Sequence, residues 1–509
     1  MTAERPGIRL ARGLLLTIAS VYPVVFLVVT WLRIRHPFGL EFLEGSMLVG
    51  VERVLAGEPL YVAPSLHYVS LMYTPLYYYA GAAVAVLLGP SLFSLRLVSV
   101  FSTVVCFGII QRIVRRHTGS GHFGWIAACL FAASYAACGS WFDVARVDML
   151  FLALFLAAVL LLHRPSTAAW MAAGLFFFLA FLAKQSALVM VLPILLYAFQ
   201  ADRRRAAWLA GTLVAAIGLS TWIGDHATAG WYSRFIFELP RGSYDRVDQR
   251  ILTFWTRDLL GVFPAALLAS VAYLGWVLGQ AVKAPSGARD QQSLLLLAAT
   301  LGLVGGSWGS RIHHGGYVNV LLPAYTALCI TAPVAMQRTL ATLRADAAGE
   351  RSWLEPAVYA LAIAQFGVLA FDPVRLVPTR ASLEAGRRLV HAISEMDGDV
   401  LVAYEPILAE MAGKPRYAHV GALAWLSHSG DDEAKRDVVA AFNRAFIRRR
   451  FAGVIVSDDW LQSLEGFRNA YAPSERPILA DPDVFWPVTG AQVRPDSLYL
   501  PRPGRARGP

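Results

Sequence analysis

The chain has 509 residues, of which 56% are hydrophobic and 16% charged, and its formal net charge is +10. A water-soluble fold could not bury so large an apolar fraction in ordinary cores, so the composition predicts an integral membrane protein. The basic residues cluster at the ends of apolar segments. This placement is typical of topogenic arginines and of contacts with anionic lipid, so no nucleic-acid partner is expected.

Eleven apolar segments are candidate transmembrane helices, given a spanning length of about 20 residues. They cover residues 14–32, 97–114, 123–141, 149–162, 167–182, 186–200, 206–224, 258–280, 292–308, 318–336 and 353–371. The first follows Arg5, Arg9 and Arg12 and lacks a small-residue cleavage site, so we expect a retained signal anchor with a cytoplasmic N-terminus. Basic residues then fall in every predicted cytoplasmic loop, and the chain after Phe371 is expected to lie outside.

The segment between the first two spans, residues 33–96, is expected to be the first periplasmic loop. It carries Glu41 and Glu44 directly after the first apolar segment. Carboxylates at the mouth of a hydrophobic bundle are costly to keep there, so the pair is expected to be functional, with plain interfacial charges as the alternative. The tyrosine-rich residues 73–89 are expected to form a helix along the membrane interface, where amphipathic rings collect.

Charged motifs recur at the ends of later apolar segments. Arg146 and Asp148 open one span, and a helix cap is the alternative role for Asp148. Lys184 separates two short segments, so we expect a break in the helix there, which is tolerated where backbone lines a cavity or is buried; snorkelling to the headgroups is the alternative. His313 and His314 are adjacent, and no third ligand at metal spacing accompanies them.

The chain after residue 371 has an ordinary soluble composition. Two β-branched runs, residues 400–404 and 453–457, each follow an amphipathic helical stretch. We therefore expect an all-α polytopic membrane bundle of about 11 helices over residues 1–371, and a small extracytoplasmic α/β domain over residues 372–500. The tail, residues 501–509, is expected to be disordered.

The order of these motifs resembles GT-C superfamily glycosyltransferases that use polyprenyl-phosphate sugars, in the group that includes lipid A aminoarabinose transferase and relatives of protein O-mannosyltransferase. The resemblance covers roughly residues 10–370. It is carried by Glu41-x-x-Glu44-Gly45 with Arg53, Gly57 and Pro59-Leu60-Tyr61, by Tyr73-x-Pro75-Leu76-Tyr77, Arg146-Val147-Asp148, Lys184-Gln185-Ser186 and Gly315-Gly316-Tyr317-Val318-Asn319. The group often has aspartate in the first motif and threonine where Ser186 stands here.

The resemblance implies an inverting glycosyltransferase in the bacterial plasma membrane. It would move a sugar from a polyprenyl-phosphate donor to a glycan, lipid or protein of the cell envelope, on the extracytoplasmic face. A lipid phosphate is already a good leaving group, so one carboxylate base and a few cations would suffice. The implied base is Glu41 or Glu44, with Asp148 as the next candidate.

The remaining implied site residues contact the donor phosphate or line the substrate site. The expected phosphate contacts are Lys184, Arg311, His313, His314 and Arg146. The expected lining residues are Arg53, Tyr61, Tyr73, Tyr77, Gln185, Tyr317 and Asn319. No cofactor is assigned, and a divalent metal held through Glu41, Glu44 or Asp148 remains open.

Two other functions are compatible with a charged, membrane-embedded cavity. A transporter or flippase of lipid-linked sugars would need one too, and inverted repeats with paired broken helices would favour it. No repeated half is evident in the sequence, and the acidic residues crowd one face of the predicted membrane domain. A non-catalytic envelope-assembly subunit, with the C-terminal domain as its binding part, is the second alternative.

Overall fold

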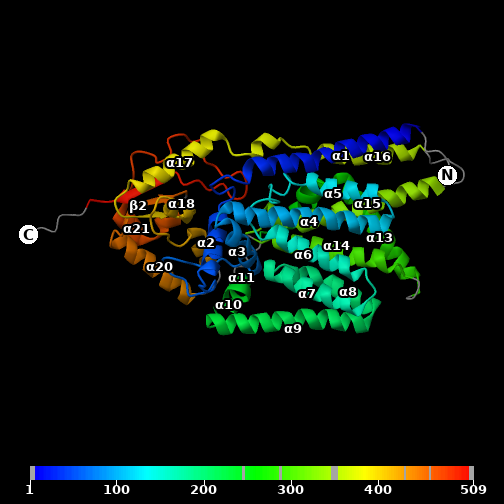
Figure 1. The fold of residues 1–509 in the computed structure, drawn as a ribbon, viewed down its shortest axis with the longest axis horizontal. Coiled ribbons are helices and arrows are strands. Elements are labelled where there is room, and N and C mark those ends of the chain that lie inside the picture. Colours follow the sequence, from blue (N-terminus) through cyan, green and yellow to red (C-terminus); the bar gives the residue numbers. More distant parts are fainter. Residues whose placement is uncertain are drawn as a thin grey trace, which may run out of the picture.

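The computed structural model describes residues 6–242, 247–285, 289–313, 315–345, 353–428, 432–457 and 460–503. The molecule is a long helical bundle with a small β-sheet at one end (Figure 1). The N-terminal helix starts at the opposite end of the bundle, so the bundle separates the N-terminus from the sheet.

Helices occur at all eleven predicted apolar segments. They are α1 (Pro6–Arg33), α4 (Leu92–Thr118), α5 (Gly121–Ala133), α6 (Asp148–Leu162), α7 (Thr167–Ala183), α8 (Ala187–Ala201), α9 (Arg203–Thr228), α13 (Pro264–Lys283), α14 (Gln291–Arg311), α15 (Leu322–Ala345) and α16 (Leu354–Val368). Among the described residues, six helices are long and apolar enough to cross a membrane, or seven if α16 and the bent helix after it count as one span. The chain is therefore a multi-pass membrane protein, and eleven spans remains a prediction.

Shorter elements gather at the end of the bundle that faces the sheet (Figure 1). From the first loop come α2 (Glu44–Leu55) and α3 (Leu76–Leu88). Between α9 and α13 the chain forms α10 (Trp231–Ser233), the π-helix η1 (Arg234–Glu238), α11 (Leu239–Gly242), α12 (Gln249–Thr253) and a second π-helix, η2 (Phe254–Leu260). The 3-10 turn η4 (Val318–Leu321) precedes α15.

One predicted span is shorter than expected. The segment predicted over residues 123–141 is helical only to Ala133, and residues 134–147 form buried turns. Gly139 and Ser140 adopt left-handed backbone conformations, with φ of 71° and 57°, which end helical continuation. Irregular backbone at this depth is tolerated because it is enclosed by protein. The predicted break at Lys184 is confirmed, since α7 ends at Ala183 and α8 begins at Ala187.

The C-terminal residues form a mixed four-stranded sheet in the order β1 (Asp399–Val402), β2 (Phe451–Val456), β4 (Ser497–Pro501) and β3 (Tyr471–Pro473). β1 and β2 are parallel, and β4 is antiparallel to both of its neighbours. The accompanying helices are η5 (Pro373–Leu376), α17 (Arg380–Ser394), α18 (Pro406–Met411), α19 (Val420–His428), α20 (Asp432–Ile447), η6 (Trp460–Ser463) and α21 (Glu465–Ala470). The predicted small α/β unit is therefore present.

The tail prediction is tested only in part. Pro501 is the last residue of β4, and the backbone N–H of Arg502 donates to the carbonyl of Ala470 at 2.8 Å. The predicted disorder is therefore wrong for these two residues, because strand pairing and a backbone hydrogen bond hold them. Residues 504–509 lie outside the described residues.

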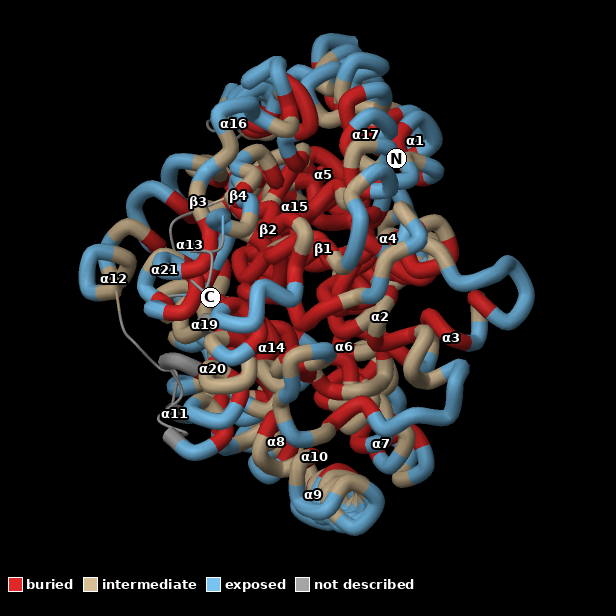
Figure 2. Tube along the Cα trace, turned by 90° about the vertical axis from the view of Figure 1, so that its left-hand side faces the viewer, coloured by how far each residue is buried: buried red, intermediate tan, exposed pale blue. Residues whose placement is uncertain are grey.

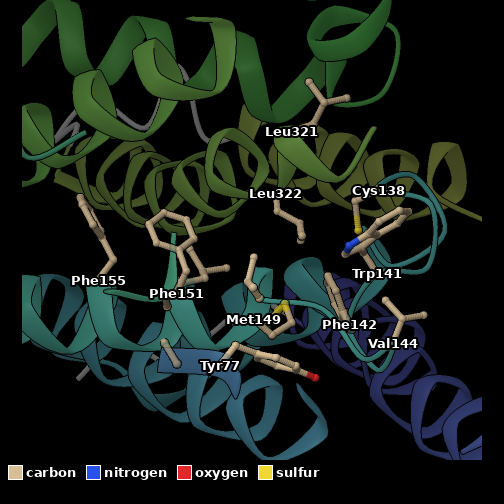
Figure 3. Close-up of a cluster of buried hydrophobic side chains, with 14 of the residues drawn as sticks. Tyr77, Cys138, Trp141, Phe142, Val144, Met149, Phe151, Phe155, Leu321 and Leu322 are labelled. Atoms are coloured by element: carbon tan, nitrogen blue, oxygen red, sulfur yellow. The ribbon is translucent and has the colours of Figure 1, made fainter. Parts of the chain in front are cut away.

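The bundle and the C-terminal unit share a hydrophobic core. Leu401, Tyr417 and Val420 of the C-terminal unit belong to the same buried cluster as the side chains of α1 to α16, and Figure 2 shows buried backbone along the centre of the molecule. In Figure 3, aromatic side chains of the buried turns, including Trp141 and Phe142, gather with residues of α6 and α15. This packing fixes the turns that carry the charged site residues described below.

Candidate active site

The candidate active site lies where the helical bundle meets the C-terminal unit. Four segments distant in sequence meet there: residues 38–45, residues 140–148, the break at Lys184, and residues 311–319. Each carries charged or amide side chains, whose burial in hydrophobic surroundings costs free energy unless they have hydrogen-bond or ion-pair partners. The charged side chains of the site differ in how many hydrogen-bond partners they have, and this difference determines which of them can bind or react with a substrate.

Glu44 is buried and fully paired. Its carboxylate accepts hydrogen bonds from Arg96 Nε and Nη2 at 3.0 and 2.6 Å, and from the backbone N–H groups of Leu40 and Ala145, both at 2.6 Å. Burial alone would raise the pKa of Glu44, but Arg96 and the two N–H donors outweigh it and lower the pKa. Glu44 therefore ties the first loop to α4 and to the turns before α6, as a permanently ionised anchor.

Glu41 is equally buried, with 1% of its surface exposed, but is only partly paired. Oε2 accepts from Arg146 Nη1 at 2.6 Å and from the backbone N–H of Leu43 at 3.0 Å. Oε1 and the Nε of Arg146 have no hydrogen-bond partner among the described residues. Burial raises the pKa of Glu41 despite the opposing charge of Arg146. This pair therefore keeps one acceptor and one donor available for a bound group.

The C-terminal unit covers Glu41. The backbone N–H of Thr489 donates to the carbonyl of Leu40 at 3.2 Å. Gly490 follows with φ of 79°, and a Cβ placed on it would lie 2.7 Å from Glu41 Cγ and 3.2 Å from Oε1. Only glycine permits this close approach, because any side chain would overlap the carboxylate. The C-terminal unit thus forms one wall of the candidate site.

Both carboxylate oxygens of Asp148 accept hydrogen bonds from side chains of the site. Its Oδ1 accepts from Lys184 Nζ at 2.6 Å and from Asn319 Nδ2 at 3.1 Å, and its Oδ2 accepts from Trp141 Nε1 at 2.9 Å. The structure thus joins three motifs that are distant in sequence. Asp148 heads α6, but its contacts are made across the site, so the alternative of a simple helix cap does not describe it.

The cations near residue 311 are tied to an acid and to backbone carbonyls. Arg311 Nε donates to Asp258 at 2.7 Å, and its Nη1 donates to the carbonyl of Gly316 at 2.6 Å. Arg250 Nη1 donates to the carbonyls of His313 and Gly316. His313 Nδ1 accepts from the backbone N–H of Gly315 at 3.0 Å. The predicted phosphate contact His314 lies outside the described residues.

Some of the predicted lining residues lie near the Glu41–Arg146 pair, and others lie away from it. The hydroxyl of Tyr73 bonds to Arg146, and Tyr317 is 45% exposed and close enough to feel the charges of Glu41 and Arg146. Support for the residues near the pair comes from Tyr61, Tyr77 and Gln185, which donate to the carbonyls of Tyr73, Leu95 and Met72, respectively.

Arg53 lies away from the pair. It pairs with Glu58 at 2.8 Å, donates to the carbonyl of Pro59 and lies 4.1 Å over the ring of Tyr68. These contacts hold the turn after α2 together and do not join Arg53 to the Glu41–Arg146 pair.

Besides Asp258, sequence reasoning missed three buried charges of this region. Arg96 is the last residue of the predicted first loop, and it neutralises Glu44. Arg33 donates to both oxygens of Asp143 and to the carbonyls of Ser140 and Leu376, which fastens α1 to the buried turns. A charge directly at the end of an apolar run was the available signal for both arginines.

The third missed charge is Glu405, which follows β1. It is buried beside Gly39, its Oε2 has no partner within the described part of the chain, and burial with the nearby Glu44 and Glu41 raises its pKa to about 8. Glu405 is therefore a neutral acid at pH 7. No sequence signal identified it, because the contact joins residues far apart in the chain.

Across the described ranges, no three His, Cys, Asp or Glu side chains come together as a ligand group. Glu41, Glu44 and Asp148 each face a cationic side chain.

The sequence and the fold both have matches among known proteins. Residues 73–224 match the sequence profile of a family described as Dolichyl-phosphate-mannose-protein mannosyltransferase. The structure of ArnT from Cupriavidus metallidurans bound to undecaprenyl phosphate has a TM-score of 0.57 and 16% identity, over 98% of this chain and 99% of that chain. The structure of its apo state has a TM-score of 0.57 and 15% identity, over 96% of this chain and 97% of that chain. No curated protein sequence matches the chain.

An archaeal protein shares the same architecture over most of the chain. The oligosaccharyltransferase AglB from Archaeoglobus fulgidus, in complex with an inhibitory peptide and a dolichol-phosphate, has a TM-score of 0.53 and 11% identity, over 88% of this chain and 70% of that chain. At these identities the structural matches show a common fold. The chain therefore has a GT-C fold, and the resemblance inferred from the sequence is confirmed.

Proposed function

We propose that this membrane protein is an inverting glycosyltransferase that moves a sugar from a polyprenyl-phosphate donor to an acceptor of the cell envelope. The observation that carries the proposal is the buried Glu41–Arg146 pair at the end of an apolar bundle, in which one carboxylate oxygen has no partner among the residues that the structure describes. The family match over residues 73–224 supports a sugar linked to a lipid phosphate as donor. The undecaprenyl phosphate and dolichol-phosphate bound in the two similar structures support the same donor class.

Glu41 acts as the general base in this proposal. Its carboxylate takes the proton of an acceptor hydroxyl while that oxygen attacks the anomeric carbon of the donor. The bond between the anomeric carbon and the phosphate oxygen breaks, and the lipid phosphate leaves with the electron pair. One displacement at the anomeric carbon inverts its configuration. A raised pKa makes Glu41 a better proton acceptor than Glu44, whose pKa is lowered.

Lys184 and Arg311 are the proposed contacts of the departing phosphate. Each is partly exposed and held by one acid, Asp148 and Asp258 respectively. These acids position the cations before the donor arrives. Cations fixed in a site that excludes water stabilise developing phosphate charge without reorganising.

The site is proposed to face the extracytoplasmic side of a bacterial plasma membrane. The last turn of α4 carries Arg115 and Arg116, and α9 begins with Arg203, at the bundle end away from the sheet (Figure 1). Basic clusters are typical of the cytoplasmic end of membrane helices. The sheet and Glu41 would then lie on the opposite face, where cell-envelope acceptors are available.

The direct test is turnover by the purified protein in lipid nanodiscs, offered a panel of short-chain polyprenyl-phosphate sugars. We expect one donor to release its lipid phosphate, and NMR of the product to show an inverted anomeric centre. Product of retained configuration would contradict the mechanism. Movement of an intact donor across sealed vesicles, with no donor cleaved by the purified protein, would show a transporter instead.

A further inference from the structure

A cavity lies between the first loop and the C-terminal unit, and neither Glu41 nor Arg146 lines it. Its volume is about 260 Å³, just below the range of about 300 to 1,000 Å³ for drug-sized ligands. The proposed function leaves this cavity without a role. Its wall includes Ser46 and Val49 of α2, Tyr68 and Tyr78 of the first loop, and Tyr417 and His419 before α19.

Two buried polar atoms in the wall have no hydrogen-bond partner among the described residues. They are Ser46 Oγ and His419 Nε2, on side chains that are 8% and 5% exposed. His419 Nδ1 accepts from the backbone N–H of Gly421 at 2.9 Å, so Nε2 carries the hydrogen of the neutral ring. Burial lowers the pKa of His419 to about 4, which keeps the ring neutral at pH 7. A ligand hydroxyl can accept from Nε2 and also bond to the serine.

Aromatic rings and neutralised charges complete the wall. The ring of His67 stacks on Tyr417 with centroids 4.9 Å apart. The two arginines of the wall are already paired, Arg53 with Glu58 and Arg416 with Glu52 and Glu410. The two arginines thus face three carboxylates among the described residues, an excess of negative charge that disfavours a phosphate. Aromatic faces combined with neutral hydrogen-bonding groups suit a sugar ring, which presents C–H faces and hydroxyls.

The cavity adjoins the candidate active site through two neighbouring rings. Phe42 directly follows Glu41, and its ring centroid lies 5.9 Å from that of His419. His419 is also close enough to Arg146 for its charge to act on the imidazole. The cavity wall thus contacts the residue that directly follows the proposed base.

We infer that this cavity is a subsite for one neutral sugar unit of the acceptor. This inference rests on the proposed function, because only a glycosyltransferase has an acceptor. In this arrangement Lys184 and Arg311 bind the donor phosphate, and Ser46 and His419 bind the acceptor sugar. The C-terminal unit, whose role the sequence left open, then supplies half of the acceptor site.

The test separates sugar binding from catalysis. Saturation-transfer NMR on the protein in nanodiscs, with a panel of methyl glycosides, reports binding even if no donor is turned over. The variant Val49→Phe fills the cavity and Ser46→Ala removes one hydrogen-bonding group. Leu55→Phe adds the same ring at an exposed position of α2 and serves as the matched control.

We expect at least one glycoside to give a signal that is lost in Val49→Phe, weakened in Ser46→Ala and unchanged in Leu55→Phe. In turnover assays, Val49→Phe should raise the acceptor KM at least tenfold while donor hydrolysis by water stays within twofold. No signal from any glycoside, or equal signals in all variants, would overturn the subsite. Glycoside binding that is lost in Val49→Phe, without cleavage of any donor, would establish a sugar-binding cavity but refute the proposed function and, with it, the acceptor role.

Discussion

At the residue scale, the degree of pairing separates carboxylates that look alike in sequence. Glu41 and Glu44 are three positions apart and equally buried. Glu44 accepts four hydrogen bonds, whereas one oxygen of Glu41 has no partner in the described part of the chain. The sequence could predict that the pair matters, because the membrane makes charge costly. It could not choose between them, because Arg96 and Arg146 reach them from distant segments.

Arg146 sets the ionisation of Glu41 and gives a prediction of pH dependence. Glu41 must be ionised to act as a base, so activity should fall as pH drops through its raised pKa. The guanidinium of Arg146 opposes the effect of burial, and Arg146→Gln should therefore move this acid limb to higher pH. The pH profile of kcat/KM for both proteins checks this. A limb that stays in place or moves to lower pH would contradict the assignment of Glu41.

Glu405 gives a prediction about stability. Its folded-state pKa of about 8 lies above the ordinary glutamate value of 4.5, so the folded state holds a proton that the unfolded state has released. The resulting stability is complete below the ordinary value and is lost as pH rises through 8. Between pH 7 and 9 the loss should be about 1.4 kcal/mol.

Thermal unfolding of the wild type and of Glu405→Gln at several pH values measures this loss. The wild-type unfolding temperature should fall relative to that of the variant across this range, because glutamine cannot ionise. Parallel curves for the two proteins would show that Glu405 does not titrate there.

At the element scale, hydrophobic pattern located the helices better than their ends. All eleven apolar segments contain helices, and a lysine between two apolar runs was enough to predict the break after α7. The end of α5 was missed because residues 134–142 are largely apolar and their helical continuation is stopped by local backbone geometry at Gly139 and Ser140. These turns carry Asp143 and Arg146, so the missed boundary is also the part of the site that sequence could not place.

Gly490, in the segment between β3 and β4, gives a further prediction. Gly490→Ala should place a methyl group 2.7 Å from Glu41 Cγ, displace the carboxylate and lower kcat/KM. Gly413 has a similar φ of 72° with nothing within 4 Å of an added Cβ, so Gly413→Ala is the matched control. Both variants should lose about 1 to 2 kcal/mol of stability from backbone strain. Equal turnover in the two variants would show that a side chain at position 490 does not displace the Glu41 carboxylate.

At the scale of the whole molecule, the site belongs to neither the bundle nor the C-terminal unit alone. Composition predicted a membrane bundle, and strand patterns predicted a small α/β unit, but neither could show that the two share a core and meet over Glu41. Such contacts join residues more than 300 positions apart, and a single sequence carries no periodicity that reports them. The order of the motifs along the chain supplied the resemblance that the fold confirmed.

The most direct test of the account is turnover of a polyprenyl-phosphate sugar by Glu41→Gln and Glu44→Gln, each with its thermal unfolding temperature measured. Removing a general base typically lowers the rate about 10² to 10⁴-fold. We predict this loss for Glu41→Gln in a protein that still folds. The unfolding temperature should fall further in Glu44→Gln, because Glu44 balances Arg96 and accepts four hydrogen bonds, whereas Glu41 balances Arg146 and accepts two. Undiminished turnover by a folded Glu41→Gln would contradict the central claim that Glu41 is the base.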